Sequence, residues 1–98
     1  MLQKMESIWF DGKLVPWDQA QVHVLTHGLH YGTGVFEGIR TYACPDGTSA
    51  VFRLPEHSKR LINSAKILGL NMPYTADEIS KAIIETVVAN KLSEGYIR

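Results

Sequence analysis

The sequence has little cysteine, no excess of charge of either sign and no long apolar run. Its 98 residues include one cysteine, Cys44, so an internal disulfide is excluded. Together with the lack of a signal peptide, this favours a reducing, cytoplasmic setting. Ten basic residues balance ten acidic ones, and no apolar run approaches the roughly 18 residues that cross a bilayer. We therefore expect neither nucleic acid nor a membrane as a partner.

Common phosphate-binding and metal-binding motifs are also missing. Gly32 and Gly34 followed by Gly38 resemble a dinucleotide fingerprint, but the third glycine is one residue late and the segment enters a strand instead of a helix. His27 and His30 are three residues apart, without a cysteine or acid at a supporting ligand spacing. We predict hydrogen-bonded loop histidines and no metal site.

Short strands are predicted in the first half of the chain. Residues 8–15 form two apolar runs around Asp11-Gly12, a dipeptide that suits the positive φ angles of a type I′ hairpin turn. The runs 35–42 and 50–54 flank a Pro-Asp-Gly turn and are rich in β-branched and aromatic residues. These two runs are expected to pair as the centre of a sheet.

The remaining segments before the second hairpin are expected to be loops. Residues 1–7 carry no pattern and are interpreted as a loose end, and residues 17–20 as a connection. Residues 21–25 are expected to add a short extended piece. Residues 28–38 hold four of the eight glycines, which predicts a flexible loop leading into the strand at 35–42.

Two helices are predicted in the second half. Pro55 at a first helical position and apolar residues at helical spacing predict a helix over 55–68. Residues 75–78 match a capping box, which predicts a second amphipathic helix ending near Leu92. Residues 96–98 resemble the start of a returning strand. The fold class expected from this order is α+β, with a mainly antiparallel sheet and two adjacent helices.

Alternate side chains of the strand at 35–42 give one face an unusual composition. Phe36, Gly38 and Arg40 lie on the same side, and a glycine inside a strand often marks a close approach to the backbone. Two interpretations stay open. This face can form the floor of a small-molecule pocket, or it can be an ordinary half-buried strand with Arg40 at its solvated end.

Two further positions are candidates for binding anions. Arg60 falls on the flank of the buried stripe of the first helix, where it can either reach solvent or hold a phosphate through its planar fork. Tyr96 and Arg98 lie on one face of the last strand and present a phenol and a guanidinium together, a pairing suited to carboxylates.

Taken together, these motifs resemble the N-terminal part of branched-chain amino acid aminotransferases, fold-type IV enzymes that depend on pyridoxal 5′-phosphate. The Phe36-Glu37-Gly38-Ile39-Arg40 run is the most discriminating part of the resemblance. The complete set, in chain order, is Trp9-Phe10-Asp11-Gly12, His30 to Arg40, Val51-Phe52-Arg53, Glu56-His57, Arg60-Leu61, Ser64-Ala65-Lys66 and Tyr96-Ile97-Arg98.

The resemblance implies a role for each matched site residue. Arg60 matches the arginine that binds the cofactor phosphate. Among the substrate-binding positions, Tyr96 and Arg98 match groups that recognise carboxylates, and Arg40 belongs to the motif without an assigned contact. The full set of implied substrate-binding residues is Tyr31, Phe36, Gly38, Arg40, Tyr96 and Arg98, of which Tyr31, Phe36 and Gly38 match the pocket for the substrate side chain.

The implied reaction is a ping-pong transamination from leucine, isoleucine or valine to 2-oxoglutarate, with the cofactor as electron sink. Residues 1–98 would form an incomplete small N-terminal domain, since none of the six lysines matches the family's Schiff-base lysine, which belongs to a large C-terminal domain. The expected partners are that domain and further copies in a homo-oligomer, at least a dimer. Two hypotheses follow: an aminotransferase portion that is inactive alone, or a stand-alone non-catalytic module with the same fold that binds a ligand or partner.

Overall fold

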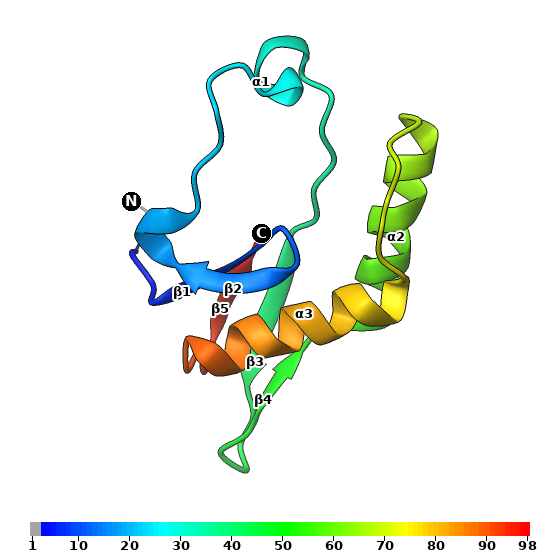
Figure 1. Ribbon diagram of the computed structural model, residues 1–98. Helices are drawn as coiled ribbons and strands as arrows, with labels where there is room; N and C mark the ends of the chain where they lie inside the picture. The colour runs from blue at the N-terminus through cyan, green and yellow to red at the C-terminus, as the bar shows by residue number, and fades with distance from the viewer. Residues whose placement is uncertain (1–2) are drawn as a thin grey trace.

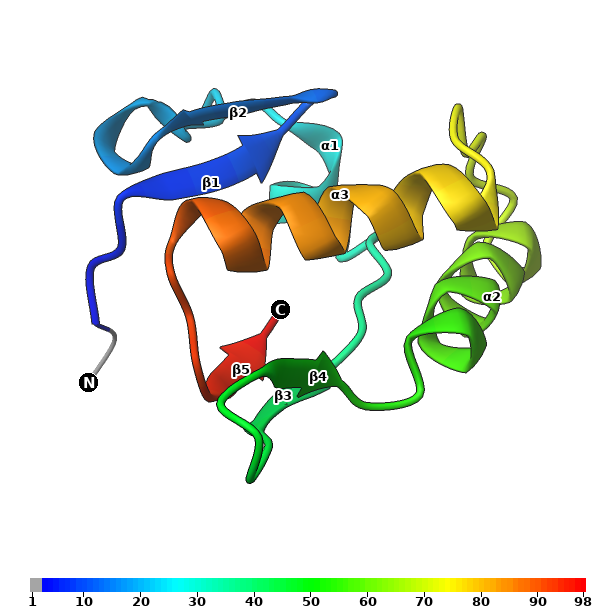
Figure 2. The ribbon, with the colours of Figure 1, turned by 90° about the horizontal axis from the view of Figure 1, so that it is seen from below.

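The computed structural model describes residues 3–98 and places one long helix between a hairpin and a three-stranded sheet (Figure 2). The elements in chain order are β1 (Ser7–Phe10), β2 (Lys13–Pro16), the 3₁₀ helix η1 (Trp17–Gln19), α1 (His27–Tyr31), β3 (Ile39–Ala43), β4 (Ser49–Val51), α2 (Leu54–Ile67), α3 (Ala76–Ala89) and β5 (Gly95–Ile97). All strand pairs are antiparallel. The predicted α+β class with two adjacent helices is confirmed.

The N-terminal hairpin has the predicted turn. Asp11 and Gly12 both have positive φ angles, 52° and 95°, and the strands β1 and β2 pair in register with Phe10 opposite Lys13. The connection that follows is η1 instead of an irregular loop. The prediction of a loose end up to Ser7 is wrong at its last residues, since Ser7 opens β1 and the amides of Glu6 and Ser7 donate to the Asn90 side chain.

The sheet has the strand order β4-β3-β5, and its strands are shorter than predicted. The strand expected over 35–42 is β3, Ile39–Ala43, because β5 begins to pair with it only at Ile39, opposite Ile97. The strand expected over 50–54 is β4, Ser49–Val51. It ends early because Arg53 adopts a left-handed conformation with φ 53° and turns the chain into α2.

Both predicted helices are present with nearly the predicted bounds. α2 starts one residue early at Leu54, and Gly69 follows it with φ 72°. α3 has the predicted capping box: the Glu78 amide donates to Thr75 Oγ1 at 3.2 Å, and the Thr75 amide donates to Glu78 Oε1 at 3.0 Å. α3 ends at Ala89, three residues before Leu92, because Lys91 has a left-handed φ of 52°.

The core is formed by residues of β2, β3, α2 and α3. Its buried residues are Val15, Ile39, Thr41, Ser58, Ala65, Ile79 and Ala82. Ile39 and Thr41 are buried while Arg40 and Tyr42 are exposed, so the predicted alternation of the strand is confirmed. The hydroxyls of Ser58 and Ser80 are 2.7 Å apart and join α2 to α3.

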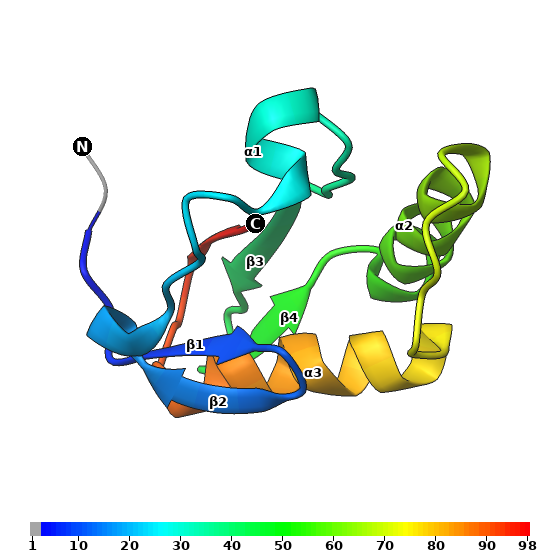
Figure 3. The same ribbon diagram turned by 45° about the horizontal axis from the view of Figure 1, so that its top comes forward.

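Residues 20–38 form a long arm with α1 at its tip, standing away from α3 and the hairpin (Figures 1 and 3). The extended piece expected at 21–25 is not a strand, and the glycine-rich loop contains α1, which Gly32 ends with φ 66°. His27 Nδ1 lies 2.7 Å from Thr33 Oγ1, and His30 Nε2 lies 2.6 Å from the Val24 carbonyl oxygen. The predicted hydrogen-bonded loop histidines are therefore confirmed. Over residues 3–98, none of the helices is long and apolar enough to cross a membrane.

Candidate functional site

Three consecutive residues, Phe36, Glu37 and Gly38, join the candidate site together. They lie just before β3, where the chain leaves the arm and enters the sheet. Each of the three is next to a predicted site residue. Phe36 contacts Arg98, Glu37 contacts Arg60, and Gly38 leaves room for Tyr96.

Phe36 and Arg98 form a stacked pair at the end of β5. The Arg98 guanidinium carbon lies 4.7 Å from the centroid of the Phe36 ring and 5.7 Å from that of Tyr96. Both distances are within the range of a cation–π attraction. The prediction that Tyr96 and Arg98 lie together is confirmed, and the aromatic rings hold the guanidinium beside the strand.

Gly38 lies directly under the Tyr96 hydroxyl. A Cβ built on Gly38 would clash with the Tyr96 Oη and lie 3.1 Å from Cζ. The glycine is therefore the place of close approach that the sequence predicted, and the approaching group is a phenol from β5.

Glu37 binds Arg60 and His57, two residues of α2. Its carboxylate accepts hydrogen bonds from Arg60 Nε at 2.7 Å on Oε2 and from Arg60 Nη2 at 2.7 Å on Oε1. The Nδ1 of His57 lies 2.7 Å from Oε1. The Glu37 side chain is 7% exposed, while that of Arg60 is 66% exposed. A buried carboxylate thus holds an arginine whose far side faces solvent.

The two donors keep Glu37 ionised. Its hydrogen bonds to Arg60 first, and then to His57, lower the pKa of the Glu37 carboxyl from 4.5 to about 2, although desolvation by burial acts in the opposite direction. The pairing with Glu37 also raises the pKa of Arg60. An ionised carboxylate only accepts hydrogen bonds, so His57 must donate from Nδ1.

Two predicted site residues lie elsewhere in this chain. Arg40 faces Tyr96 across the β3–β5 ladder, but its guanidinium carbon lies 5.9 Å from the Tyr42 ring. Tyr31 lies on α1, where it is 73% exposed and packs against His27 with ring centroids 4.4 Å apart. The structure therefore brings together Phe36, Gly38, Tyr96 and Arg98, with Arg60 joined to them through Glu37.

A cavity of about 780 Å³ adjoins this group of residues. Its walls come from the inner face of α3, from β1 and from β5, and Phe36, Tyr96 and Arg98 lie at one side of it. Most of the remaining lining is apolar. The cavity offers an apolar space next to a guanidinium and a phenol, a combination that suits a small molecule with one charged end.

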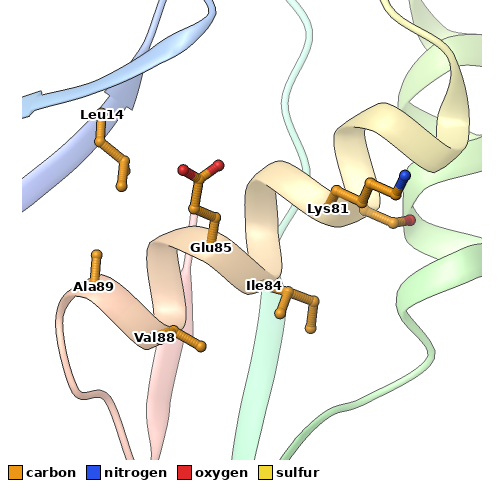
Figure 4. Close-up of a pocket in the computed structure, with 7 residues that line it drawn as sticks. Leu14, Lys81, Ile84, Glu85, Val88 and Ala89 are labelled. Atoms are coloured by element: carbon orange, nitrogen blue, oxygen red, sulfur yellow. The ribbon is translucent and has the colours of Figure 1, made fainter.

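A second hollow over α3 carries a different set of groups (Figure 4). Its lining includes Leu14 of β2 together with Ile84, Glu85, Val88 and Ala89 of α3. None of the residues that bring the candidate site together lines this hollow. We therefore place the site at the cavity beside Phe36.

Sequence reasoning assigned no role to Glu37 and His57. The signal that could have found them is the spacing of His57 and Arg60, which lie three residues apart on one face of α2. Within residues 3–98, no cluster of three or more histidine, cysteine or acidic side chains is arranged to hold a metal ion.

Comparisons with known proteins show which family this chain resembles. The chain is 54% identical over 91 residues to a branched-chain-amino-acid aminotransferase of Pseudomonas aeruginosa, covering 93% of this chain and 29% of that protein. The crystal structure of the Escherichia coli branched-chain amino acid aminotransferase superposes with a TM-score of 0.91 at 44% identity, covering 95% of this chain and 30% of that one. The T.th. enzyme complexed with N-(5′-phosphopyridoxyl)-L-glutamate superposes with a TM-score of 0.91 at 46% identity, over 95% and 31%.

These shares set the scale of the match. The chain spans about three tenths of the length of the curated relatives it matches. A family model for amino-transferase class IV matches residues 34–98, which is more than half of the chain and includes the Phe36–Gly38 segment and every residue that it contacts. The chain therefore belongs to the class IV aminotransferase family.

Proposed function

We propose that this chain forms the substrate-binding and phosphate-binding part of a pyridoxal-phosphate-dependent aminotransferase that moves the amino group of leucine, isoleucine or valine to 2-oxoglutarate. The observation that carries the proposal is the Phe36-Glu37-Gly38 segment, which meets Arg98 and Tyr96 at one edge of the cavity and holds Arg60 through Glu37. The names of the matched relatives support an amino transfer that involves branched-chain amino acids.

The cofactor fits the chain at Arg60. Glu37 occupies the Nε and Nη2 side of the guanidinium, so the Nη1 edge, in a side chain that is 66% exposed, is left for a phosphate. A relative that holds a phosphopyridoxyl compound supports this assignment. Bound pyridoxal phosphate supplies the electron sink of transamination, and the role of Arg60 is to anchor and orient it.

The substrate side chain and carboxylate are assigned to the other members of the group. Phe36 forms an apolar wall of the cavity, which suits a branched aliphatic side chain, and Gly38 contributes by leaving room for the Tyr96 hydroxyl beside it. Tyr96 and Arg98 offer a hydroxyl and a guanidinium to a carboxylate, and the glutamate moiety in the solved relative fits such a pair. Arg40 lies on the neighbouring strand with its guanidinium near the Tyr42 ring, and it keeps a proposed substrate-binding role without an assigned contact.

Tyr31 takes its proposed place in the pocket through assembly. It belongs to α1, which lies at the tip of the arm (Figure 1), and the arm also exposes Val24, Leu25 and Leu29. Exposed apolar side chains on a projecting segment favour contact with another molecule. A homo-oligomer of at least two copies would bring Tyr31 of one copy to the pocket of another.

The remaining parts of the proposal concern the rest of the enzyme. We assign residues 1–98 to the family's small N-terminal domain, and the Schiff-base lysine to a large C-terminal domain that partners it. The 98-residue chain alone is then expected to be inactive. A single cysteine fits a cytoplasmic location.

The direct test compares the 98-residue chain with the complete gene product that carries it. Each is incubated with pyridoxal phosphate, reduced with borohydride and assayed with leucine and 2-oxoglutarate. We expect turnover and one labelled lysine in the complete gene product, and neither in the 98-residue chain. Turnover by the short chain would contradict the assigned domains, and no turnover by the complete gene product would favour a non-catalytic binding module.

A second measurement tests the phosphate role. Arg60→Ala in the complete gene product should weaken cofactor retention roughly tenfold or more, because a charge-assisted hydrogen bond contributes about 1.5–3 kcal/mol. Arg53→Ala is the matched control. Arg53 is an exposed arginine just before the same helix, and it pairs with Glu56. Unchanged retention in Arg60→Ala would refute the phosphate role.

A further inference from the structure

We propose that Glu37, supported by His57, is a positioning residue that fixes the Arg60 guanidinium so that one defined edge faces the cofactor phosphate. The inference rests on the proposed phosphate role of Arg60 and adds the groups that act through it. Neither Glu37 nor His57 would touch the phosphate, because both lie on the opposite side of the guanidinium from its open edge.

Glu37 and Arg60 form a bidentate pair. Two parallel hydrogen bonds of 2.7 Å join Arg60 Nε and Nη2 to the two oxygens of Glu37. A bidentate pair of this kind sets the plane of the guanidinium as well as its distance. What remains for an anion is the Nη1 group and the second proton of Nη2, which point away from Glu37 in a fixed direction.

Glu37 is held rigidly by its surroundings. Its side chain is 7% exposed and its backbone precedes Gly38, which lies against Tyr96, and Ile39, which is buried in β3. Arg60, by contrast, projects from α2 with a 66% exposed side chain. Without the carboxylate, a long exposed arginine would have to lose rotamer freedom each time it bound an anion.

His57 holds the Glu37 carboxylate in place. Its Nδ1 donates to the same Oε1 that accepts from Arg60 Nη2, and these two nitrogens lie 3.4 Å apart. Since both are donors, their approach is not a hydrogen bond but the result of sharing one acceptor. His57 therefore fixes the rotation of the carboxylate, and the carboxylate fixes Arg60.

The affinity for phosphate then depends on the alignment of Arg60 more than on net charge. Glu37 and Arg60 carry opposite charges, so the pair attracts a phosphate only weakly through net charge, and the alignment of the open edge decides the binding. A change that preserves the charge of Glu37 but moves its carboxylate should then weaken phosphate binding. This expectation separates positioning from simple electrostatics.

The test uses the complete gene product and two probes that differ only in the phosphate, pyridoxamine 5′-phosphate and pyridoxamine. The dissociation constant of pyridoxamine divided by that of pyridoxamine 5′-phosphate reports the phosphate contribution. Glu37→Asp keeps the charge but shortens the side chain, and we expect the ratio to fall about tenfold. Glu56→Asp, the same change at an exposed carboxylate of α2, should leave the ratio unchanged.

Two further measurements keep the proposal falsifiable if Glu37→Asp fails to fold. His57→Leu removes the donor to Glu37 and should lower the ratio about threefold, whereas His57→Asn, which places an amide donor near the position of Nδ1, should restore most of it. In the protein without ligand, the Arg60 Nε–H resonance should show slow solvent exchange, and fast exchange of this proton would overturn the proposal.

The outcomes distinguish this inference from the function on which it rests. If Arg60→Ala lowers the ratio but Glu37→Asp and His57→Leu do not, the positioning role is refuted while the phosphate role stands. If Arg60→Ala itself leaves the ratio unchanged, the phosphate role fails, and the positioning of a phosphate-binding edge fails with it.

Discussion

Gly38 shows how a single missing side chain can shape the site. A Cβ at this position would meet the hydroxyl end of Tyr96, which is 57% exposed and free to shift. The φ of Gly38 is not in the left-handed region that favours glycine, so the constraint at this residue is space instead of backbone conformation. Replacing the glycine should therefore act through Tyr96.

We expect Gly38→Ala to move the Tyr96 side chain and to destabilise the fold by about 1 kcal/mol, the size typical of mild overpacking. Removing the hydroxyl in Gly38→Ala/Tyr96→Phe should recover part of that loss, and a double-mutant cycle of unfolding free energies measures the coupling. Gly34→Ala is the control, because nothing lies within 4 Å of a Cβ built there. Equal losses at Gly34 and Gly38 would contradict the role of Tyr96.

Among the elements, α3 has the most clearly encoded beginning. Thr75 and Glu78 satisfy each other's backbone amides as a capping box, and the helix then packs against α2 and against β1 of the hairpin (Figure 2). α2 starts differently: its N-cap, Arg53, makes no side-chain capping bond, and a proline occupies its first turn. The start of α3 therefore depends on the side chain of its N-cap, Thr75, whereas the start of α2 does not depend on the side chain of Arg53.

Thr75→Ala should destabilise the protein by about 1 kcal/mol, since it removes the oxygen that accepts from the Glu78 amide. Thr75→Ser, which keeps that oxygen, should remain close to the original stability. Chemical denaturation of both variants measures the difference. If the serine and alanine variants lose the same amount, the hydroxyl does not provide the capping energy.

At the scale of the whole molecule, Asn90 joins the first strand to the end of α3. Its Oδ1 accepts from the amides of Glu6 and Ser7 at 3.0 and 2.9 Å, and its Nδ2 donates to the Ser7 carbonyl at 3.0 Å. These groups are 83 or 84 residues apart in the chain. The Asn90 amide thus satisfies backbone groups at the start of β1, as a neighbouring strand would.

Asn90→Ala should destabilise the protein by about 1–3 kcal/mol, because it leaves partly buried backbone groups of Ser7 without their partner. Hydrogen exchange should show the loss locally, with the Ser7 amide losing protection while α2 amides keep theirs. Asn63→Ala, at an exposed asparagine of α2, is the control. Unchanged protection at Ser7 would show that β2 alone holds β1 in place.

The sequence by itself determined the features that depend on local chemistry. The Asp11-Gly12 turn, the capping box at Thr75 and the start of α2 follow from the conformations that those residues prefer. The alternation of Ile39 and Thr41 with Arg40 and Tyr42 follows from the period of a strand. The order of the motifs also indicated the aminotransferase family before any contact was known.

Only the tertiary structure decided how distant segments meet. Glu37 became the partner of both His57 and Arg60 because residues 36–38 lie beside α2, and the Tyr96 hydroxyl came to lie over Gly38 because β5 returns beside β3. The strand ends and the small helix α1 were likewise missed, because they depend on which neighbours are present for pairing. Such contacts join residues far apart in sequence, and no local pattern encodes their geometry.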